Sequence, residues 1–517
     1  MSTSSGESQE LVLQREKKLR AIADLGFELY PRKFEFTHTI PQILSLYSEH
    51  TAEALAAAKV TVRVAGRVMT IRPHGKAGFA HLQGEGERLQ IYVRLDAVGE
   101  RDFELYKLLD LGDPIGVEGY LFRTRTGELT VHAERLHFLA KALLPLPEKW
   151  HGLADVEIRY RQRYLDLMVN SEVRQVFERR SRLIKALRDF LDAEGYLEVE
   201  TPMMQPLAGG AMARPFVTHH NTLDLDLYLR IAPELYLKRL IVGGFDRVYE
   251  VNRNFRNEGI STQHNPEFTM LEFYQAYADY RDMIELSERL LRHVARTVAG
   301  SLQFDYGDHH ISLEKFQTYT MKEAIVRFWP DRADKKPKLE DFNGPKAVFE
   351  WVGAYNQWAE QSEGAHPPLA VPPGTASGVA FQGLFEAVAE RHLIQPTFIL
   401  DFPLEVSPLA KQKPDDPNFV ERFELYVGGM EIANAFSELN DPAEQRDRFR
   451  YQQLLREKGD LSAHAIDEDY IRALSYGMPP TGGEGIGIDR LTMLLTNSHS
   501  IRDVILFPLL RPEKAPA

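Results

Sequence analysis

The run from Arg247 to Tyr277, RVYEVNRNFRNEGISTQHNPEFTMLEFYQAY, constrains the fold of this chain more than any other segment. Its first part, Val248 to Phe255, is rich in Val, Tyr and Phe and predicts a strand, which a polar turn and a second strand follow. The first strand therefore ends in a loop that carries Arg256 beside Glu258. A guanidinium group matches two phosphate oxygens at once, and a carboxylate accepts hydrogen bonds from an amine or helps to hold a metal. An isolated pair of this kind is usually an ordinary surface ion pair on a solvated hairpin, so other segments must decide.

Two other segments are informative when they are taken together with this one. Near the C-terminus, GIGIDR (485–490) is followed by the apolar run LTMLL, which predicts a strand that enters a helix with Arg490 at the junction. Between Ser171 and Gly195 the apolar residues follow helical spacing, and Gly195 ends the predicted helix. The following YLEVETPMM predicts a strand broken by Pro202.

In this order the three segments resemble the signature motifs of class II aminoacyl-tRNA synthetases. The unit from Ser171 to Met204 is similar to motif 1, the dimer element, while Phe255–Glu258 is similar to motif 2 and Gly485–Arg490 to motif 3. Further segments resemble the bacterial type of class II (subclass IIb) lysyl-tRNA synthetase. They are GGAMARPFVTHHNTLDLDLYLRIAPELYLKRL, NPEFTMLEF, HLIQPTFI, FSELND and NSHSIRDVILFP. The resemblance covers roughly Arg15 to Pro512 and is weakest between Gly307 and Phe381.

The resemblance implies an α+β fold: an antiparallel-sheet class II synthetase catalytic domain with an N-terminal OB-fold β-barrel. Independently, the residue pattern from Val60 to Phe138 predicts five short strands separated by turns, which suits a small barrel. Residues Ser8 to Tyr30 predict an amphipathic helix whose basic residues either face solvent or contact RNA. A Pro- and Gly-rich segment that starts at His366 predicts a loop. We expect a helical extension (1–58), an OB-fold anticodon-binding domain (59–147), a hinge (148–169), a catalytic domain (170–512) and a tail (513–517).

Composition excludes several classes of protein. The net charge of −13 argues against a general nucleic-acid binder, so any contact with RNA must come from local basic surfaces. The absence of cysteine excludes disulfides and thiolate zinc sites and suits a cytoplasmic enzyme. No apolar run approaches the roughly 18–20 residues of a membrane span, and the N-terminus lacks the pattern of a signal peptide.

The reaction that the resemblance implies joins two anions, because the carboxylate of lysine attacks the α-phosphorus of ATP. Such a site needs fixed positive charge and metal ions, here Mg²⁺, but no general base. The resemblance assigns catalysis to Arg256, Glu258 and Arg490. It assigns ATP binding to these three residues together with His264, Asn265, Phe268 and Glu424, and it assigns the metal to Glu424 and Glu431.

A lysine substrate carries two separated ammonium groups, so two acidic sites are expected. Glu234 matches the family's contact to the α-amino group, and Glu272, helped by Tyr274, matches the contact to the ε-ammonium group. A glutamate inside the apolar run from Phe268 to Phe273 is costly to bury unpaired, which itself suggests a cationic ligand. The other lysine-site positions that match the family are Gly210, Asn434, Phe436 and Glu438.

The barrel of the resembled family reads the anticodon of tRNA(Lys). The matching positions are Phe79, for stacking on the central uridine, and Arg72, Gln90 and Glu128, for reading base edges. A phenylalanine in a strand is more often a core residue than a stacking platform, and the sequence alone does not decide between the two for Phe79. The resemblance also implies a homodimer.

Some positions depart from the family pattern. Ala433 and Ala435 stand where glycine is usual, Met430 replaces a basic residue, and Glu484 lies where leucine is usual. Each alanine adds a methyl group that we expect near the substrate, where it would change the size of the pocket.

Three other functions fit the sequence less well. An aspartate or asparagine enzyme of the same subclass would need a cationic or amide-reading pocket, which Glu234 and Glu272 oppose. A paralogue that attaches a lysine-like group to an elongation factor lacks the barrel. A non-catalytic RNA-binding relative would lose the arginines of motifs 2 and 3, and both are present.

Overall fold

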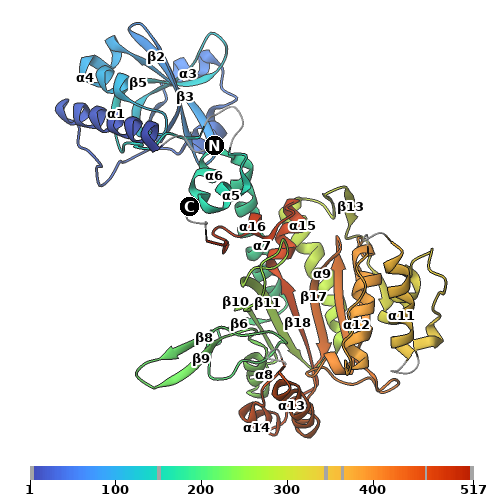
Figure 1. The fold of residues 1–517 in the computed structure, drawn as a ribbon. Coiled ribbons are helices and arrows are strands. Elements are labelled where there is room, and N and C mark those ends of the chain that lie inside the picture. Colours follow the sequence, from blue (N-terminus) through green and yellow to red (C-terminus); the bar gives the residue numbers. More distant parts are fainter. Residues whose placement is uncertain (1–4, 148–152, 343–346, 363–365, 460–462, 513–517) are drawn as a thin grey trace. The chain divides into compact units, whose positions relative to one another are not determined.

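The computed structural model describes residues 5–147, 153–342, 347–362, 366–459 and 463–512. The chain forms two compact units, Met1–Arg174 and Gln175–Ala517 (Figure 1). The expected tail and the first five residues of the expected hinge, 148–152, lie outside the described residues. In the described part of the chain, no helix has both the length and the apolar character needed to cross a membrane.

The first unit is built on a closed five-stranded barrel in the order β1-β2-β3-β5-β4, which confirms the predicted OB-fold. Its strands are β1 (Thr61–His74), β2 (Ala77–Gly84), β3 (Glu87–Arg94), β4 (Pro114–Arg123) and β5 (Leu129–Phe138). Its helices are α1 (Ser5–Asp24), α2 (Ile40–Tyr47), α3 (Ala52–Ala58), α4 (Leu95–Leu108), α5 (Val156–Arg161) and α6 (Arg163–Val169). Alternate residues of each strand fill the barrel, so the intervening side chains of β1, β2, β3 and β5 form an outer face.

Helix α1 is shorter than predicted because Gly26 adopts a left-handed backbone conformation (φ 78°) just after it. Two of its basic residues are used inside the unit. Arg15 donates to the carbonyl oxygen of Leu144 (3.0 Å), and Lys18 forms an ion pair with Asp110 (2.6 Å). These contacts hold the helix on the barrel, which leaves Lys17 and Arg20 as its exposed basic residues.

The second unit is built on an eight-stranded sheet in the order β14-β15-β16-β17-β18-β11-β10-β6. Neighbours are antiparallel except for the outermost pairs, β14 with β15 and β10 with β6. The strands are β6 (Leu197–Glu198), β10 (Arg247–Phe255), β11 (Glu267–Ala276), β14 (Gln317–Thr320), β15 (Thr397–Pro403), β16 (Phe419–Val427), β17 (Met430–Ser437) and β18 (Thr481–Gly487). The predicted antiparallel sheet and the secondary structure of the three predicted motif elements are therefore confirmed. A helix (Ser171–Ala193) precedes β6, β10 pairs with β11, and β18 runs into α15 (Ile488–Thr496).

The remaining elements surround this sheet. The helices are α7 (Ser171–Ala193), α8 (Glu234–Val242), α9 (Tyr280–Ala299), α10 (Met321–Phe328), α11 (Ala347–Glu360), α12 (Ser377–Val388), α13 (Pro442–Glu457), α14 (Glu468–Leu474) and α16 (Ile501–Val504). Short 3₁₀ helices lie at Leu339–Phe342, Glu390–His392 and Leu404–Val406. Two small sheets pair β12 (Gln303–Tyr306) with β13 (His309–Ser312), and β7 (Met204–Gln205) with β9 (Leu225–Leu229) and β8 (Val217–His220). Figure 1 shows the β8–β9 hairpin extending away from the large sheet.

Strand alternation divides the large sheet into an apolar and a polar face. On β11, Leu271 and Phe273 join the core that α7, α9 and α15 cover, whereas Glu272 and Tyr274 point the other way. The same alternation corrects the expectation for β17. Ala433 and Ala435 are buried in that core and do not line the opposite face, so their methyl groups pack against the helices and do not narrow a pocket.

Candidate functional site

A cavity of about 790 Å³ opens on the polar face of the large sheet. It brings together every site residue predicted for the catalytic unit: Gly210, Glu234, Arg256, Glu258, His264, Asn265, Phe268, Glu272, Tyr274, Glu424, Glu431, Asn434, Phe436, Glu438 and Arg490. These residues come from distant parts of the chain and meet because β10, β11, β16, β17 and β18 are neighbours in the sheet.

Arg256 directly follows β10, and its backbone N–H donates to the carbonyl oxygen of Pro266 (2.8 Å). Its guanidinium carbon lies 5.0 Å from the ring centroid of Phe268, and its Nε atom is buried without a partner. Burial lowers the pKa of Arg256, and the nearby carboxylates, Glu258 foremost, oppose this shift. A buried cation with an unused donor is suited to bind an anion.

Arg490, on the first turn of α15, closes one side of the cavity. It donates to the backbone oxygen (2.8 Å) and to the carboxylate (3.1 Å) of Glu431 on β17. It also lies 3.3 Å from Nε2 of His264, whose other ring nitrogen contacts the hydroxyl of Ser261 at 2.9 Å. Burial and the charge of Arg490 lower the pKa of His264, so a neutral ring that accepts from Arg490 is favoured.

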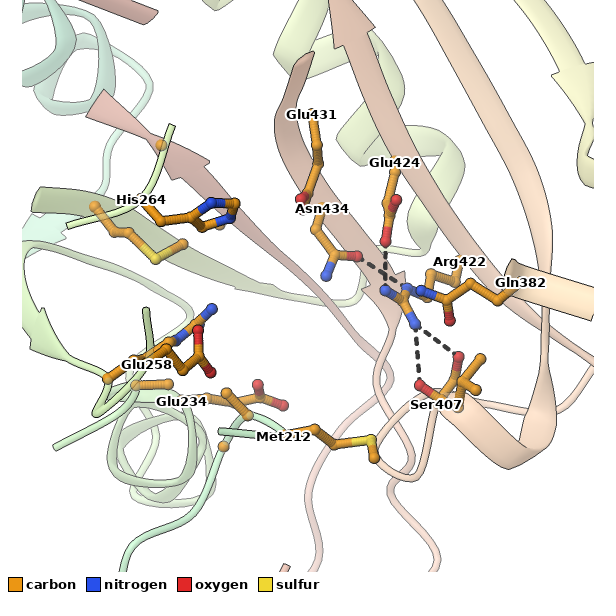
Figure 2. Close-up of a pocket in the computed structure, with 18 of the residues that line it drawn as sticks. Met212, Glu234, Glu258, His264, Gln382, Ser407, Arg422, Glu424, Glu431 and Asn434 are labelled. Carbon is orange, nitrogen blue, oxygen red and sulfur yellow. Dashed lines mark hydrogen bonds and ion pairs between the residues drawn. The ribbon is translucent and has the colours of Figure 1, made fainter. Parts of the chain in front are cut away.

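Glu424 and Glu431 point into the cavity from neighbouring strands (Figure 2). Glu424 accepts from Arg422 (2.6 Å) and from the hydroxyl of Tyr426 (2.6 Å). Burial, together with repulsion from Glu431, raises the pKa of Glu424 to about 7. A divalent cation would relieve this repulsion, so the two carboxylates fit a metal whose other ligands come from a bound substrate or water. Among the described residues, no group of three or more His, Cys, Asp or Glu could hold a metal ion.

Glu272 lies in the floor of the cavity on β11, opposite Glu250 on β10. The Tyr274 hydroxyl, two residues along the same face, lies 3.3 Å from its carboxylate. Burial, with repulsion from Glu234 and Glu250, raises the pKa of Glu272 to about 8. Among the described residues Glu272 forms no ion pair, and the charge of Arg256 offsets only part of this shift.

Glu234 begins α8 and forms an ion pair with Lys238, one helical turn further on, which also pairs with Glu438. The Lys238 side chain is fully buried and its ammonium lies 5.3 Å from the ring centroid of Phe436. Burial alone would lower the pKa of Lys238, but the two carboxylates outweigh it and raise the pKa. Sequence reasoning missed Lys238, although glutamate four residues before lysine is the spacing of a helical ion pair.

Local structure explains why two of the predicted site residues, Gly210 and Asn434, suit their positions in the cavity. Gly210 has a left-handed conformation (φ 89°), and a Cβ there would come within 3.0 Å of Glu234 Cβ, so glycine is required. Asn434 uses its side-chain oxygen to accept from Nε of Arg422 (3.0 Å), which leaves its amide nitrogen for a ligand.

Several cavity residues were not foreseen. Arg422 links Glu424, Asn434 and the hydroxyl of Ser407 (2.9 Å), as Figure 2 shows. The sequence predicted a loop that starts at His366, but it did not predict that this loop lies over the cavity. Part of this loop and the adjacent α12 contribute Leu369, Ala370, Val371, Pro372, Thr375, Val379, Ala380, Gln382, Gly383 and Glu386. Nothing local in the sequence signals this, because it depends on how α12 packs beside β15.

The barrel positions also come together, on the outer face of β1, β2, β3 and β5. Arg72 lies opposite Phe79 in the β1–β2 pair, and the Phe79 ring stacks on Tyr92 with centroids 4.6 Å apart. Phe79 is half-buried on this outer face and is absent from the apolar barrel core. Gln90 donates to Glu128 (2.8 Å). Tyr92, Tyr120, Phe122 and His132 extend the aromatic surface beyond Phe79, and only Phe79 was foreseen.

Fold and site together define a class of protein. The family model for tRNA synthetases class II (D, K and N) matches residues 155–511, and the model for the OB-fold nucleic acid binding domain matches residues 62–139. The chain is 54% identical over 513 residues to the lysine–tRNA ligase of Pelotomaculum thermopropionicum, covering 98% of this chain and 96% of that protein. It is 54% identical to the lysine–tRNA ligase of Carboxydothermus hydrogenoformans (98% and 99% covered) and 51% identical to that of Syntrophomonas wolfei (100% of both). The chain belongs to the lysine–tRNA ligase family.

Proposed function

We propose that this protein is a lysine–tRNA ligase that activates L-lysine with ATP and transfers it to the 3′ end of tRNA(Lys). The observation that carries this proposal is the buried Glu272, which lies in a class II cavity with its pKa raised and forms no ion pair with any residue that the structure describes. A substrate ammonium group supplies the missing charge, whereas the carboxylate or amide of aspartate or asparagine does not.

Lysine would lie with its ε-ammonium group at Glu272 and Tyr274 and with its α-amino group near Glu234. Phe436 would pack against the alkyl chain, while Gly210, Asn434 and Glu438 complete the wall. The substrate carboxylate then extends toward Arg256, the cavity cation with an unpaired buried donor.

In the first step an oxygen of the lysine carboxylate forms a bond to the α-phosphorus of ATP. The bond from that phosphorus to the bridging oxygen breaks, and pyrophosphate leaves with the electron pair. Arg256 would stabilise the α-phosphate and Arg490 the terminal phosphates, while Phe268, His264 and Asn265 would hold the adenine part and Glu258 its amino group. The nucleophile is already an anion, so positioning and charge stabilisation account for the catalysis.

Glu424 and Glu431 would hold Mg²⁺ with the ATP phosphates, in accord with their mutual repulsion. The bound ion would neutralise phosphate charge and polarise the phosphoryl group for attack. A complex with a non-hydrolysable ATP analogue and Mg²⁺ in which neither carboxylate lies within direct or one-water reach of the ion would refute this assignment.

In the second step the terminal ribose hydroxyl of tRNA attacks the carbonyl carbon of lysyl-adenylate and AMP leaves. We assign anticodon binding to the barrel (59–147) and catalysis to residues 170–512, with a hinge and a short tail outside them. A homodimer is supported by the apolar groove in which Phe177 and Ile184 of α7 lie beside the exposed Phe507. We expect the enzyme to act in the cytoplasm, where its substrates are.

ATP–pyrophosphate exchange, screened across the twenty amino acids, tests the function. Exchange should depend on lysine and on Mg²⁺. Exchange that depends on aspartate or asparagine would identify the sister enzyme, and no exchange with any amino acid would identify a non-catalytic relative.

A further inference from the structure

A chain of hydrogen-bonded polar side chains crosses the outer face of the barrel: Thr70, His81, Glu128, Gln90 and Thr130. Of these five, only Glu128 and Gln90 were predicted from the sequence as site residues. Thr70 on β1 lies opposite His81 on β2, which lies opposite Gln90 on β3, which in turn lies opposite Thr130 on β5. Glu128 precedes β5 and joins the chain between His81 and Gln90.

Glu128 determines which ring nitrogen of His81 carries a proton. The Nε2 atom of His81 lies 2.9 Å from Oε1 of Glu128, and a carboxylate can only accept, so Nε2 carries a proton. In the neutral ring Nδ1 is then an acceptor, and the Thr70 hydroxyl, 2.7 Å away, donates to it. The same hydroxyl oxygen accepts from the backbone N–H of His81 (3.1 Å), so Thr70 is held in place on both sides.

Glu128 also fixes the orientation of the Gln90 amide. The amide nitrogen donates to Oε2 of Glu128 (2.8 Å), because the amide oxygen would be repelled there. The amide oxygen of Gln90 therefore faces Thr130, whose hydroxyl donates to it at 2.9 Å. Each carboxylate oxygen of Glu128 thus has one partner within the barrel.

We propose that Thr70 and His81 form a positioning relay that fixes Glu128 as an acceptor beside the Gln90 amide as a donor, and so make the barrel select a base with an imide edge. This inference rests on the proposed function, and it adds two residues that act through Glu128. The side chain of Glu128 is 46% exposed and that of His81 is 19% exposed, so Glu128 is the group that faces a ligand. His81 and Thr70 are therefore positioning residues.

The hydrogen-bonding edges of the bases explain how the relay would select uracil over cytosine. The second N–H of Gln90 and the free lone pairs of Glu128 present a donor next to an acceptor. Uracil offers a matching carbonyl oxygen next to N3–H. Cytosine held in the same position offers an amino group next to an unprotonated nitrogen instead and places like against like. Phe79, two residues before His81 on the same face of β2, supplies a ring on which the selected base can stack.

Direct binding of RNA tests the relay without relying on the aminoacylation reaction. Two anticodon stem-loops that differ only in the central base, UUU and UCU, are titrated against the full-length protein and against His81→Leu, His81→Gln and Thr70→Val. Leucine removes the donor to Glu128, glutamine retains an N–H that can replace it, and valine keeps the shape of Thr70 without its hydroxyl. Melting temperature and lysine-dependent pyrophosphate exchange are recorded for every variant as checks on the fold and the catalytic unit.

The wild-type protein should bind UUU at least about tenfold more tightly than UCU. His81→Leu should reduce this ratio about tenfold, mainly by weakening UUU; Thr70→Val should reduce it less, and His81→Gln should retain most of it. Equal weakening of both RNAs by His81→Leu, or a wild-type protein that does not distinguish them, would overturn the relay. A wild-type protein that distinguishes the RNAs but lacks lysine-dependent exchange would instead refute the proposed ligase function and leave the relay standing.

Discussion

Lys238 and Glu438 form an ion pair in which neither side chain is exposed to solvent. Lys238 also pairs with Glu234, so one protein ammonium group already balances part of the negative charge of the lysine site. Burial raises the pKa of Glu438, and Lys238 is the main group that opposes this shift. The negative charge that remains for a substrate cation therefore depends on Lys238 as much as on Glu234 and Glu438.

We expect Lys238→Met to destabilise the protein by about 3–5 kcal/mol, because it leaves two buried carboxylates without their cation. The KM for lysine should rise as well, since Glu234 and Glu438 then take up protons or move. Urea unfolding and exchange kinetics measure the two effects. Lys335→Met is the control, because its ion pair with Glu350 is exposed and its loss should change stability by no more than about 1 kcal/mol. Similar stability in the two variants would mean that the buried pair is not maintained in solution.

Arg256→Ala should reduce lysine-dependent pyrophosphate exchange by about 10²–10³-fold or more while the protein remains folded. The reason is the loss of a buried guanidinium group where the α-phosphate would lie. Arg253→Ala, near the end of the strand that precedes Arg256 and in an exposed ion pair with Glu267, should stay within a few-fold of wild type. Exchange by Arg256→Ala at the level of this control would remove Arg256 from the mechanism.

Glu484 provides a prediction about the pH dependence of stability. It is buried on the core side of β18, where one oxygen contacts the Ser287 hydroxyl at 2.6 Å and the other has no partner. Burial raises its pKa from 4.5 to about 8. Between these values the unfolded chain loses this proton and the folded protein keeps it, so stability falls as pH rises.

Glu484→Gln cannot lose a proton, so its unfolding free energy should not share this decline. Relative to the variant, the wild-type protein should lose up to about 1.4 kcal/mol per pH unit between pH 4.5 and 8. Urea unfolding of both proteins at several pH values measures the difference. Parallel pH profiles would show that Glu484 is ionised in the folded state.

The motif strands could be predicted because each has a strong local pattern, and strand alternation then brings Glu272 and Tyr274 to one face. The face of β17 could not be predicted in the same way. Tyr426 pairs with Glu431 and Leu425 pairs with Ala433, so Ile432 is an extra residue in the ladder. This bulge lets Glu431 and Asn434, which are three apart, share the cavity face, and it turns the alanines toward the core.

Residues that act through tertiary contacts were also beyond sequence reasoning. Lys238 follows Glu234 at the spacing of an ordinary surface pair, and only the packing of α8 against β11 shows that the pair is buried. The loop after His366 reaches the cavity from the region of the chain where the resemblance is weakest. Arg422 lies between two segments that match the family and belongs to neither of them.

Phe79→Ala should weaken aminoacylation of tRNA while adenylate formation persists. The half-buried ring lies on the outer face of the barrel, and stacking on one base contributes about 1–3 kcal/mol, which corresponds to roughly a 5- to 150-fold change. Aminoacylation and pyrophosphate exchange, measured on the same preparation, separate the two steps. Phe36→Ala is a control for the loss of an exposed phenylalanine outside the barrel strands. An equal loss in both assays would show that Phe79 supports the fold.

Glu272→Gln should remove the preference for lysine, because glutamine keeps the shape of the side chain and removes its charge. The ε-ammonium group must give up water to enter the cavity, and only a buried opposite charge offsets that loss. Without its partner the buried cation costs about 3–5 kcal/mol, so kcat/KM for lysine should fall by orders of magnitude. Norleucine has no such cation and should lose much less.

The pH dependence of kcat/KM provides a second, independent measurement on the same residue. The pKa of Glu272 in the free protein is raised to about 8, so the group is mostly protonated at neutral pH and becomes a carboxylate as pH rises. Wild-type kcat/KM for lysine should therefore increase with pH up to about 8, and this increase should be absent from Glu272→Gln. Glu267→Gln, an exposed glutamate on the same strand, should keep the wild-type profile. Parallel losses for lysine and norleucine, with an unchanged pH profile, would mean that Glu272 supports the sheet rather than recognising the substrate.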